Sequence, residues 1–129
     1  MANEATLRDR LSHPIDFTVG NATSIEKGAF LKLVDARTAS GAALIGAVCA
    51  GIAAREKVSG DGRTRLAVFR NGIFDVRASG AITVGEPVQM AENNDVMRAA
   101  ANASGAVVIG SALETATDAE VIQIHLNIK

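Results

Sequence analysis

Apolar and polar residues alternate with a period of two along several short stretches of this chain. The clearest stretch has apolar residues at Val121, Ile122, Ile124, Leu126 and Ile128, with Gln123, His125 and Asn127 between them. Alternation of this kind is typical of a β-strand that buries one face. Because β-branched residues dominate the apolar positions, the pattern predicts that Glu120–Ile128 forms a central strand.

Turn signals divide a second β-rich region, at 66–90. Asn71-Gly72 is the dipeptide that most readily adopts positive φ at both central positions of a tight turn, so it predicts a hairpin between Leu66–Arg70 and Ile73–Ala78. Gly85-Glu86-Pro87 predicts a second turn, between Ile82–Val84 and Val88–Met90, because proline cannot donate to a central ladder.

The N-terminal segment, Met1–Ser12, is polar apart from two leucines. Leu7 and Leu11 are four residues apart, a spacing that would place them on one side of a short helix. His13-Pro14 disfavours helix, and the alternation of Ile15, Phe17 and Val19 with polar residues predicts an extended strand after it. The segment is therefore either a frayed terminus attached to a first strand or an arm that docks on a neighbouring molecule.

The remaining pattern consists of further short strands and turns. Strands are expected at Ala29–Val34, Asp95–Ala100 and Ala106–Leu113, with a turn at Ala91–Asn94. A loop is expected at Ala101–Ser104. Ala99–Ala101 could instead form a helical turn, because alanine is the best helix former. Ser59–Gly62 is a dense turn signal. It lies between the charged strand ends Arg55–Lys57 and Arg63–Arg65 and predicts a protruding hairpin tip.

Two pairs of segments suggest an internal repeat. Ile25–Leu33 and Ile82–Met90 both place an isoleucine three residues before a glycine that leads into an apolar strand. Leu44–Ala47 and Val108–Ser111 also correspond, each before a strand-like run. Two degenerate copies of one β unit, packed face to face, would explain the similarity, although matches this short also arise by chance.

Composition supports one small β domain. Apolar residues make up 48% of the 129 residues, but the only aromatic residues are four phenylalanines, so the core must be built from small side chains. Such a core buries little area per residue, and burial between subunits would add to it. The expected fold is all-β: a compact barrel or sandwich of short antiparallel strands, with an N-terminal arm and first strand at 1–20 and a single β domain at 21–129.

Charge and cysteine content exclude several classes of partner. The net charge is −1 and no segment concentrates positive charge, which argues against nucleic acid. A single cysteine cannot form an internal disulfide, and the N-terminus lacks the pattern of a signal peptide, so we expect synthesis in a reducing cytoplasm. The uncharged run Ala39–Ala54 is too short and too rich in alanine and glycine to span a membrane.

The sequence offers no catalytic, cofactor-binding or metal-binding motif. A phosphate loop, a nucleophile elbow and paired cysteines or histidines at ligand spacing are all missing. His125 is expected to be solvated or hydrogen-bonded, and Cys49 to be a buried, inert thiol. Asp75 with Arg77, Arg8 with Asp9, and Glu114 with Asp118 are interpreted as surface charges without an acid–base role.

Several motifs follow one another along 15–128. In order they read Ile-x-x-Gly-x-Phe-Leu-x-Leu, Gly-Ile-Phe-Asp-Val, Ala-x-x-Val-Gly-Glu-Pro-Val, Val-Val-Ile-Gly-x-Ala-Leu and Val-Ile-x-Ile-x-Leu, and rest on Gly28, Gly72–Val76, Gly85–Val88 and Ile109–Leu113. This order resembles the capsid cement, or head decoration, proteins of tailed phages. The Ala39–Ala54 run is less β-branched than the resemblance implies, which leaves its strand boundaries open.

The resemblance implies a structural role without enzymatic activity, cofactor or small-molecule substrate. Such proteins form trimers on the outer surface of the capsid, bind the major capsid protein lattice and stabilise the expanded head. Some have been labelled recombinases of the RecA or RadA type, but this chain is too short for that ATPase core and has no phosphate loop. A trimer presents each contact three times, so weak contacts add to tight binding.

The N-terminal arm supplies the candidate capsid contacts. Apolar anchoring is expected from Leu7, Leu11, Ile15 and Phe17, with Arg8 and Arg10 as partners for capsid carboxylates. Two alternatives share parts of this pattern. One is another virion structural protein, of the tail or baseplate, and the other is a small ligand-binding β-barrel, which would need a concave pocket with convergent polar groups.

Overall fold

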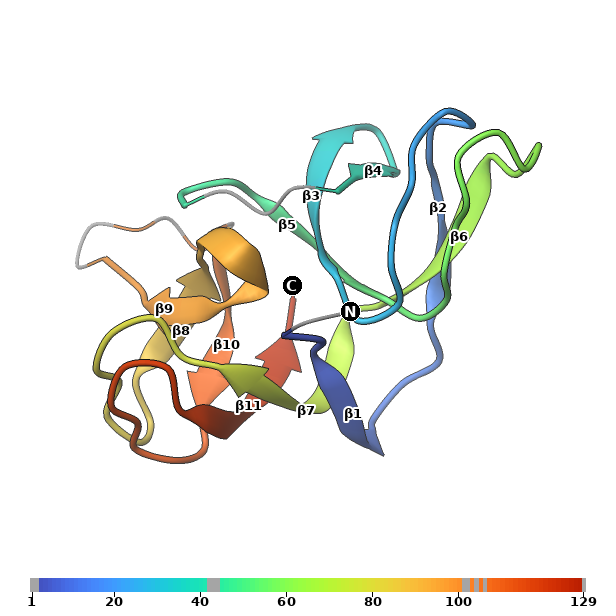
Figure 1. Ribbon diagram of the computed structural model, residues 1–129. Helices are drawn as coiled ribbons and strands as arrows, with labels where there is room; N and C mark the ends of the chain where they lie inside the picture. The colour runs from blue at the N-terminus through green and yellow to red at the C-terminus, as the bar shows by residue number, and fades with distance from the viewer. Residues whose placement is uncertain (1–2, 42–44, 101–102, 104, 106, 129) are drawn as a thin grey trace.

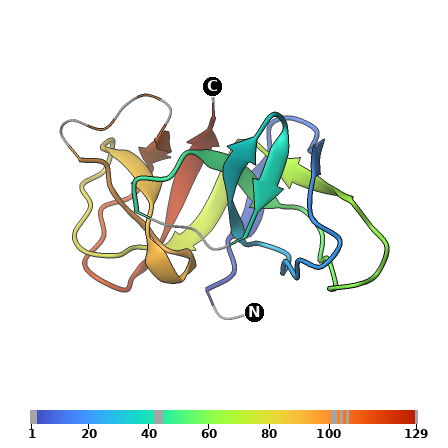
Figure 2. The same cartoon turned by 90° about the horizontal axis from the view of Figure 1, so that it is seen from above.

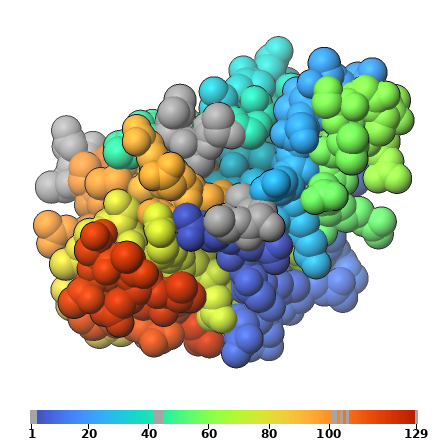
Figure 3. Space-filling view, in the orientation of Figure 1, coloured from blue at the N-terminus to red at the C-terminus, as the bar shows by residue number. Residues whose placement is uncertain are grey.

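A computed structural model describes residues 3–41, 45–100, 103, 105 and 107–128. These residues form eleven short strands and one turn of 3-10 helix, so the expected all-β class is confirmed. The strands make two units that lie side by side (Figures 1 and 2). We call 15–69 unit 1 and 71–127 unit 2. In Figure 3 the units are adjoining lobes, with the N-terminal segment running between them.

Unit 1 is a closed five-stranded barrel. Its strands are β2 (Ile15–Thr18), β3 (Phe30–Asp35), β4 (Thr38–Ser40), β5 (Cys49–Ala53) and β6 (Arg65–Phe69). The order around the barrel is β2-β4-β3-β5-β6, and β6 pairs with β2 to close it. β2 and β4 run parallel where Thr18 meets Thr38, and the other neighbours are antiparallel.

Unit 2 repeats this connectivity in a six-stranded sheet. Its strands are β7 (Asn71–Arg77), β8 (Pro87–Met90), β9 (Val96–Arg98), β10 (Val108–Ala112) and β11 (Val121–Asn127), with the 3-10 turn η1 (Glu92–Asn94) before β9 and with β1 (Thr6–Arg10) added outside β7. A parallel bridge between Ala78 and Val96 joins β7 to β9 as Thr18 and Thr38 join β2 to β4. The two predicted β units are therefore present.

The first predicted repeat match agrees with the structure residue by residue. Ile25 and Ile82 each form an isolated antiparallel bridge, to Lys57 and Ala116 respectively. The glycine that follows each isoleucine, Gly28 or Gly85, has positive φ, near 85°, and the next strand starts two residues later. This positive φ explains why a glycine precedes both strands. It also places the predicted second turn at 83–86, where the Glu86 N–H donates to the Thr83 carbonyl.

The second repeat match was in the wrong register. Leu44 lies outside the described residues, but the ladders show that Val108–Ala112 corresponds to Cys49–Ala53. Leu31 pairs with Gly51, and its counterpart Val88 pairs with Gly110. The similarity of the letters Leu-Ile-Gly-Ala therefore arose by chance. The register was difficult to predict from sequence because alanine- and glycine-rich segments have few side chains that fix the register of strand pairing.

The predicted Asn71-Gly72 hairpin is also wrong. Both residues lie inside β7, where they face Asn127 and Leu126 of β11. The chain does not reverse at this dipeptide but passes from unit 1 to unit 2. A turn here would forfeit the seven-residue pairing of β7 with β11, and this long ladder outweighs the local preference of two residues.

The N-terminal segment forms a strand and not a helix. β1 pairs antiparallel with β7 along the edge of the unit 2 sheet, with an irregularity between Leu7 and Asp9. The predicted extension after Pro14 is present as β2. Because β2 is paired with β6 and β4, it forms part of the unit 1 barrel. A functional division between 1–20 and 21–129 stays a prediction.

Most of the other predicted strands are present with shifted ends. β11 lies between β7 and β10, which confirms that the closing strand is central. The expected turn at Ala91–Asn94 contains η1. Parts of Ala99–Ala101 and Ala101–Ser104 fall outside the described residues. No helix in the part of the chain that the structure describes is long and apolar enough to cross a membrane.

The core consists of two clusters of buried side chains. One lies inside unit 1 and includes Phe17, Leu31 and Val68. The other fills unit 2 and continues onto one side of unit 1 through Phe30, Cys49 and Ile52. The units therefore pack end to side and not face to face as expected from the repeat.

The loop after β5 contains a buried lysine that the sequence pattern did not reveal. Lys57 was expected at a charged strand end, but it is only 1% exposed. Its ammonium donates to the Asn21 carbonyl at 2.8 Å, to the Val58 carbonyl at 3.2 Å and to Asp61 Oδ1 at 3.0 Å. The three donors of the ammonium thus have three acceptors, which is the condition for burying a charge.

We predict that the loop carrying Asp61 weakens in acid. The backbone N–H of Arg63 lowers the pKa of Asp61 most, and the Lys57 ammonium and the Val58 N–H act in the same direction. A pKa lowered in the folded state adds stability above the unfolded value of about 4, and this stability is lost as the pH falls through the folded value. Urea unfolding should therefore separate the wild type from Asp61→Asn more widely at pH 6 than near pH 3. An equal separation at both values would contradict the prediction.

Candidate interaction surface

The described residues contain no cluster of three or more His, Cys, Asp or Glu side chains that could hold a metal ion. His125 is half-buried, and its Nε2 lies 3.1 Å from Asn71 Oδ1, as expected for a hydrogen-bonded histidine. Asn71 is a neutral amide and not a carboxylate that would orient a catalytic imidazole.

Cys49 is buried in the core, as expected. Burial raises the pKa of its thiol to about 12, and the Gly51 carbonyl is its hydrogen-bond partner at 3.7 Å. A thiolate is the reactive form of cysteine, and almost none exists at neutral pH with this pKa. The thiol therefore acts as a small apolar group in the contact between the units.

The surface charges expected to pair along the sequence have other partners in the structure. Asp75 pairs with Arg8 across β7 and β1, at 3.3 Å, and Arg77 pairs with Asp95 through two hydrogen bonds of 2.9 and 3.0 Å. The Asp95 carboxylate raises the pKa of the Arg77 guanidinium, chiefly through the hydrogen bonds. Arg8 finds its partner on β7, which pairs with β1, and Arg77 finds Asp95 beside the bridge between Ala78 and Val96.

The carboxylates of Glu114 and Asp118 act separately. Glu114 accepts the N–H of Gln123 at 3.0 Å, and Asp118 accepts the N–H of Gly80 at 2.8 Å. Each carboxylate thus satisfies a backbone donor of another segment, Gln123 of β11 in one case and Gly80 in the other. Glu120 behaves similarly, because the Thr117 hydroxyl and N–H lower its pKa. These contacts explain the acidic residues of the loops through structure and not through acid–base chemistry.

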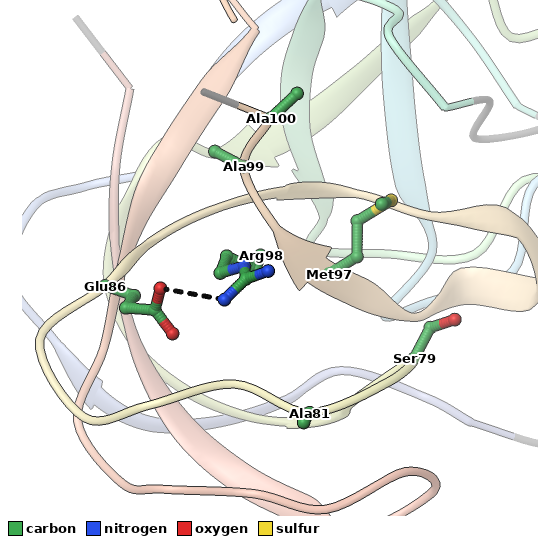
Figure 4. Close-up of a pocket in the computed structure, with 7 residues that line it drawn as sticks. All are labelled: Ser79, Ala81, Glu86, Met97, Arg98, Ala99 and Ala100. Carbon is green, nitrogen blue, oxygen red and sulfur yellow. Dashed lines mark ion pairs between the residues drawn. The ribbon is translucent and has the colours of Figure 1, made fainter. Parts of the chain in front are cut away.

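One surface hollow of about 570 Å³ lies at an edge of unit 2 (Figure 4). Its lining combines small residues with Met97 and an ion pair, Arg98 Nη1 to Glu86 Oε2 at 3.6 Å. The two charges face each other in the figure and neutralise one another. The hollow is open to solvent and brings no other charged group to its centre, so it does not have the convergent polar groups of a ligand site.

The six candidate capsid contacts lie in different environments in the structure. Arg10 and Leu11 are exposed at the end of β1, and Leu11 is 53% exposed. Leu7 is partly exposed beside Phe74, and Arg8 is held by Asp75. Ile15 is 40% exposed on β2, whereas Phe17 is 4% exposed inside the barrel. Phe17 therefore belongs to the core of unit 1.

A second hollow, of about 340 Å³, opens at one end of the unit 1 barrel. We call it the open mouth and define it by Ile15, Phe17, Leu33, Arg37 and Arg70. Arg70 Nε donates to the Ala50 carbonyl at 3.1 Å, and its guanidinium lies 5.8 Å from the centre of the Phe17 ring. Sequence analysis missed three of these residues. The one signal was Leu33, which continues the apolar strand of the repeat yet ends up 38% exposed.

The fold resembles that of a known phage structure. The head fiber gp8.5 N base of bacteriophage phi29, solved by crystallography, matches with a TM-score of 0.56 and 14% sequence identity, over 88% of this chain and 92% of that chain. At this identity the similarity concerns the fold. None of the curated proteins matches the sequence.

A family model described as phage cement protein matches residues 11–128. The matched region begins after β1 and includes both β units with their connecting loops. It also includes all the motifs on which the resemblance to cement proteins rests. Because the match spans nearly the whole sequence, this chain belongs to the phage cement protein family.

Proposed function

We propose that this chain is a capsid decoration protein that binds the outside of the major capsid protein lattice as a homotrimer and stabilises the expanded head. The family match over 11–128 carries this proposal, because cement proteins are structural proteins associated with the phage capsid. The similar fold of a head fiber base agrees with a location on the head. The proposed activity is adhesion, with no reaction catalysed.

The surface of the molecule suits an adhesive role. Large apolar side chains are exposed over both units, among them Val34, Val84 and Val121. Scattered exposed apolar residues are common on soluble proteins, so each contributes little alone. A trimer placed on a site of matching symmetry presents every contact three times, and the second and third contacts then form at high effective concentration.

We propose the exposed end of β1 as the part that touches the capsid. Arg10 and Leu11 combine a cation with an apolar side chain, and Leu7 and Arg8 extend the same strand. The Arg8–Asp75 pair and the ladder with β7 hold this strand in position before binding. A contact on an ordered strand loses less conformational entropy than one on a free terminus.

The proposal predicts that purified capsids of the parent phage, stripped of this protein, bind the added protein and withstand heating better afterwards. The double variant Arg10→Ser/Leu11→Ser should lower occupancy at least ~10-fold, since each lost contact counts three times. Occupancy is measured by co-sedimentation with capsids and by electron microscopy of the particles.

The matched control is Val58→Ser/Arg63→Ser, which removes one exposed apolar residue and one exposed arginine from the loop on unit 1. It should bind as the wild type does. Wild-type protein that stays off capsids but labels tails or baseplates would replace the proposal with the tail alternative. Equal occupancy for both double variants would reject β1 as the contact while leaving capsid decoration in place.

A further inference from the structure

The repeat shows an asymmetry between the corresponding ends of the two units. In unit 2 the end of the core is formed by Phe74, Met90 and Leu126, and all three are fully buried. Unit 1 covers them with the outer side chains of β3, β5 and β6, which we call the unit 1 flank: Phe30, Cys49, Ile52 and Phe69. Phe69 meets Phe74 edge to face, with ring centres 5.7 Å apart. One unit thus seals the end of the other.

The same positions in unit 1 are uncovered. Ile15 pairs with Val68 as Phe74 pairs with Ile124, so Ile15 is the counterpart of Phe74. Leu33, two residues after Leu31, is the counterpart of Met90, two residues after Val88. Arg70, directly after Phe69, is the counterpart of Leu126, directly after His125. These three counterparts line the open mouth. Ile15 and Leu33 are therefore apolar side chains left on the surface at positions that are core in unit 2.

Unit 2 also carries a counterpart of the unit 1 flank. The same ladders match Phe30, Cys49, Ile52 and Phe69 to Pro87, Val108, Ser111 and His125, which we call the unit 2 flank. Three of these residues, Val108, Ser111 and His125, line a surface hollow of about 340 Å³. They are half-buried, and Pro87 is exposed. The molecule therefore has one unused mouth and one unused flank.

The polar side chain beside the open mouth of unit 1 also has a counterpart beside the covered end of unit 2. In unit 2, Asn94 accepts the N–H of Phe30 at 2.7 Å and donates to the Gly28 carbonyl at 2.9 Å. The counterpart of Asn94 in unit 1 is Arg37, because Asn94 lies two residues before the partner of Met90, and Arg37 lies two residues before the partner of Leu33. The counterpart of Phe30 is Pro87, which has no N–H. An arginine side chain can only donate hydrogen bonds. Arg37 therefore suits a surface that offers the Gly85 carbonyl as an acceptor and, because Pro87 lacks an N–H, no backbone donor at that position.

We infer that the open mouth of one molecule binds the unit 2 flank of a second copy, repeating between chains the contact that joins the units within a chain. Mouth and flank are different surfaces, so the contact is head-to-tail and generates a ring when the rotation closes. The inference rests on the trimer of the proposed function: three chains would then form a ring of six β units. Both surfaces are more polar than their internal counterparts, as suits chains that are exposed before assembly.

The test measures the mass of the full chain in solution by sedimentation. Leu33→Arg puts a charge into the mouth, and Ser111→Arg puts a charge of the same sign onto the flank. Each should raise the concentration at which the trimer half-dissociates at least ~10-fold. Val84→Arg, a matched change of an exposed apolar residue outside both surfaces, should leave the trimer intact. An equimolar mixture of the two damaged variants keeps one good mouth and one good flank, so it should yield mixed dimers and no trimers.

A cross-linking experiment keeps the inference testable if a charged variant fails to fold. By correspondence with the Phe69–Phe74 contact, His125 of one copy should face Ile15 of the next. A short bismaleimide should join Ile15→Cys chains to His125→Cys chains in a mixture, and neither variant to itself, because Cys49 is buried. Self-joining of Ile15→Cys, or trimers that survive both charged variants, would overturn the head-to-tail contact alone. A wild-type monomer would overturn the trimer of the proposed function as well.

Discussion

Replacing Gly110 with alanine is expected to lower the free energy of unfolding by about 3 kcal/mol. A Cβ at this position would overlap the carbonyl oxygen of His125, and it would lie 2.9 Å from the carbonyl carbon of His125 and 3.2 Å from Leu126 Cα. These atoms belong to the backbone of β11, the central strand, so they cannot move aside as the end of a flexible side chain can. Relief requires separating β10 from β11, which pair along three residues.

The repeat predicts a similar loss at the equivalent position of unit 1. A Cβ on Gly51 would overlap the carbonyl oxygen of Phe69 and lie 2.6 Å from Val68 Cγ1. Its φ of +141° is also one that side chains avoid. Both glycines thus let a strand approach its neighbour at the same point of the barrel, which gives a physical reason for a glycine in both copies.

Urea unfolding followed by circular dichroism measures both losses, and a loss of about 3 kcal/mol corresponds to a fall in melting temperature of roughly 10 °C for a domain of this size. Gly105→Ala is the control, because no atom lies within 4 Å of the added Cβ and the backbone is not in the positive-φ region. It should change stability by less than about 0.5 kcal/mol. A Gly110→Ala variant as stable as this control would show that the two strands separate without cost.

Local patterns were sufficient for some elements. Alternation identified the strand around Val121–Asn127 because one face of β11 packs on the core along its full length. The Ile-x-x-Gly signal found the repeat because the positive φ of Gly28 and Gly85 is a property of single residues. In both cases the evidence for the structure lies within a few residues of the element itself.

The errors came where distant residues decide the structure. Asn71-Gly72 has a strong turn preference, but it is overridden by the ladder with β11, which forms more than fifty residues later in the chain. Leu7 and Leu11 have helical spacing, yet the free edge of β7 extends the segment as a strand. The open mouth gathers residues from β2, β3 and the chain after β6, so only the closed barrel reveals it.

Lys57 illustrates a further limit of sequence patterns. Its neighbours Arg55 and Glu56 are exposed, and nothing local distinguishes the third charge of the run. The structure shows that it takes the place of Ala116 in the repeat, at a position inside the barrel wall. A long side chain there can reach the carbonyls of the neighbouring loop, whereas unit 2 fills the same position with a methyl group. The two units thus close this end of the barrel by different chemistry.

We expect Lys57→Met to destabilise the protein by about 3 kcal/mol. Methionine fits the volume of the lysine stem, but it leaves the carbonyls of Asn21 and Val58 without the donor that they have now. It also leaves Asp61 without its cation, although that carboxylate keeps the N–H groups of Val58 and Arg63. These part-buried acceptors regain water only in part when the ammonium is removed, so the cost comes from the groups left behind.

Chemical denaturation of Lys57→Met measures this cost against Lys27→Met, which makes the same change at an exposed lysine. The control should stay within about 0.5 kcal/mol of the wild type. Asp61→Asn should cost less in the Lys57→Met background than in the wild type, because the contact between Lys57 and Asp61 has already been lost there. Equal stability of the Lys57→Met and Lys27→Met variants would mean that water replaces the ammonium in the loop, and that the three hydrogen bonds of Lys57 do not hold the end of the unit 1 barrel together.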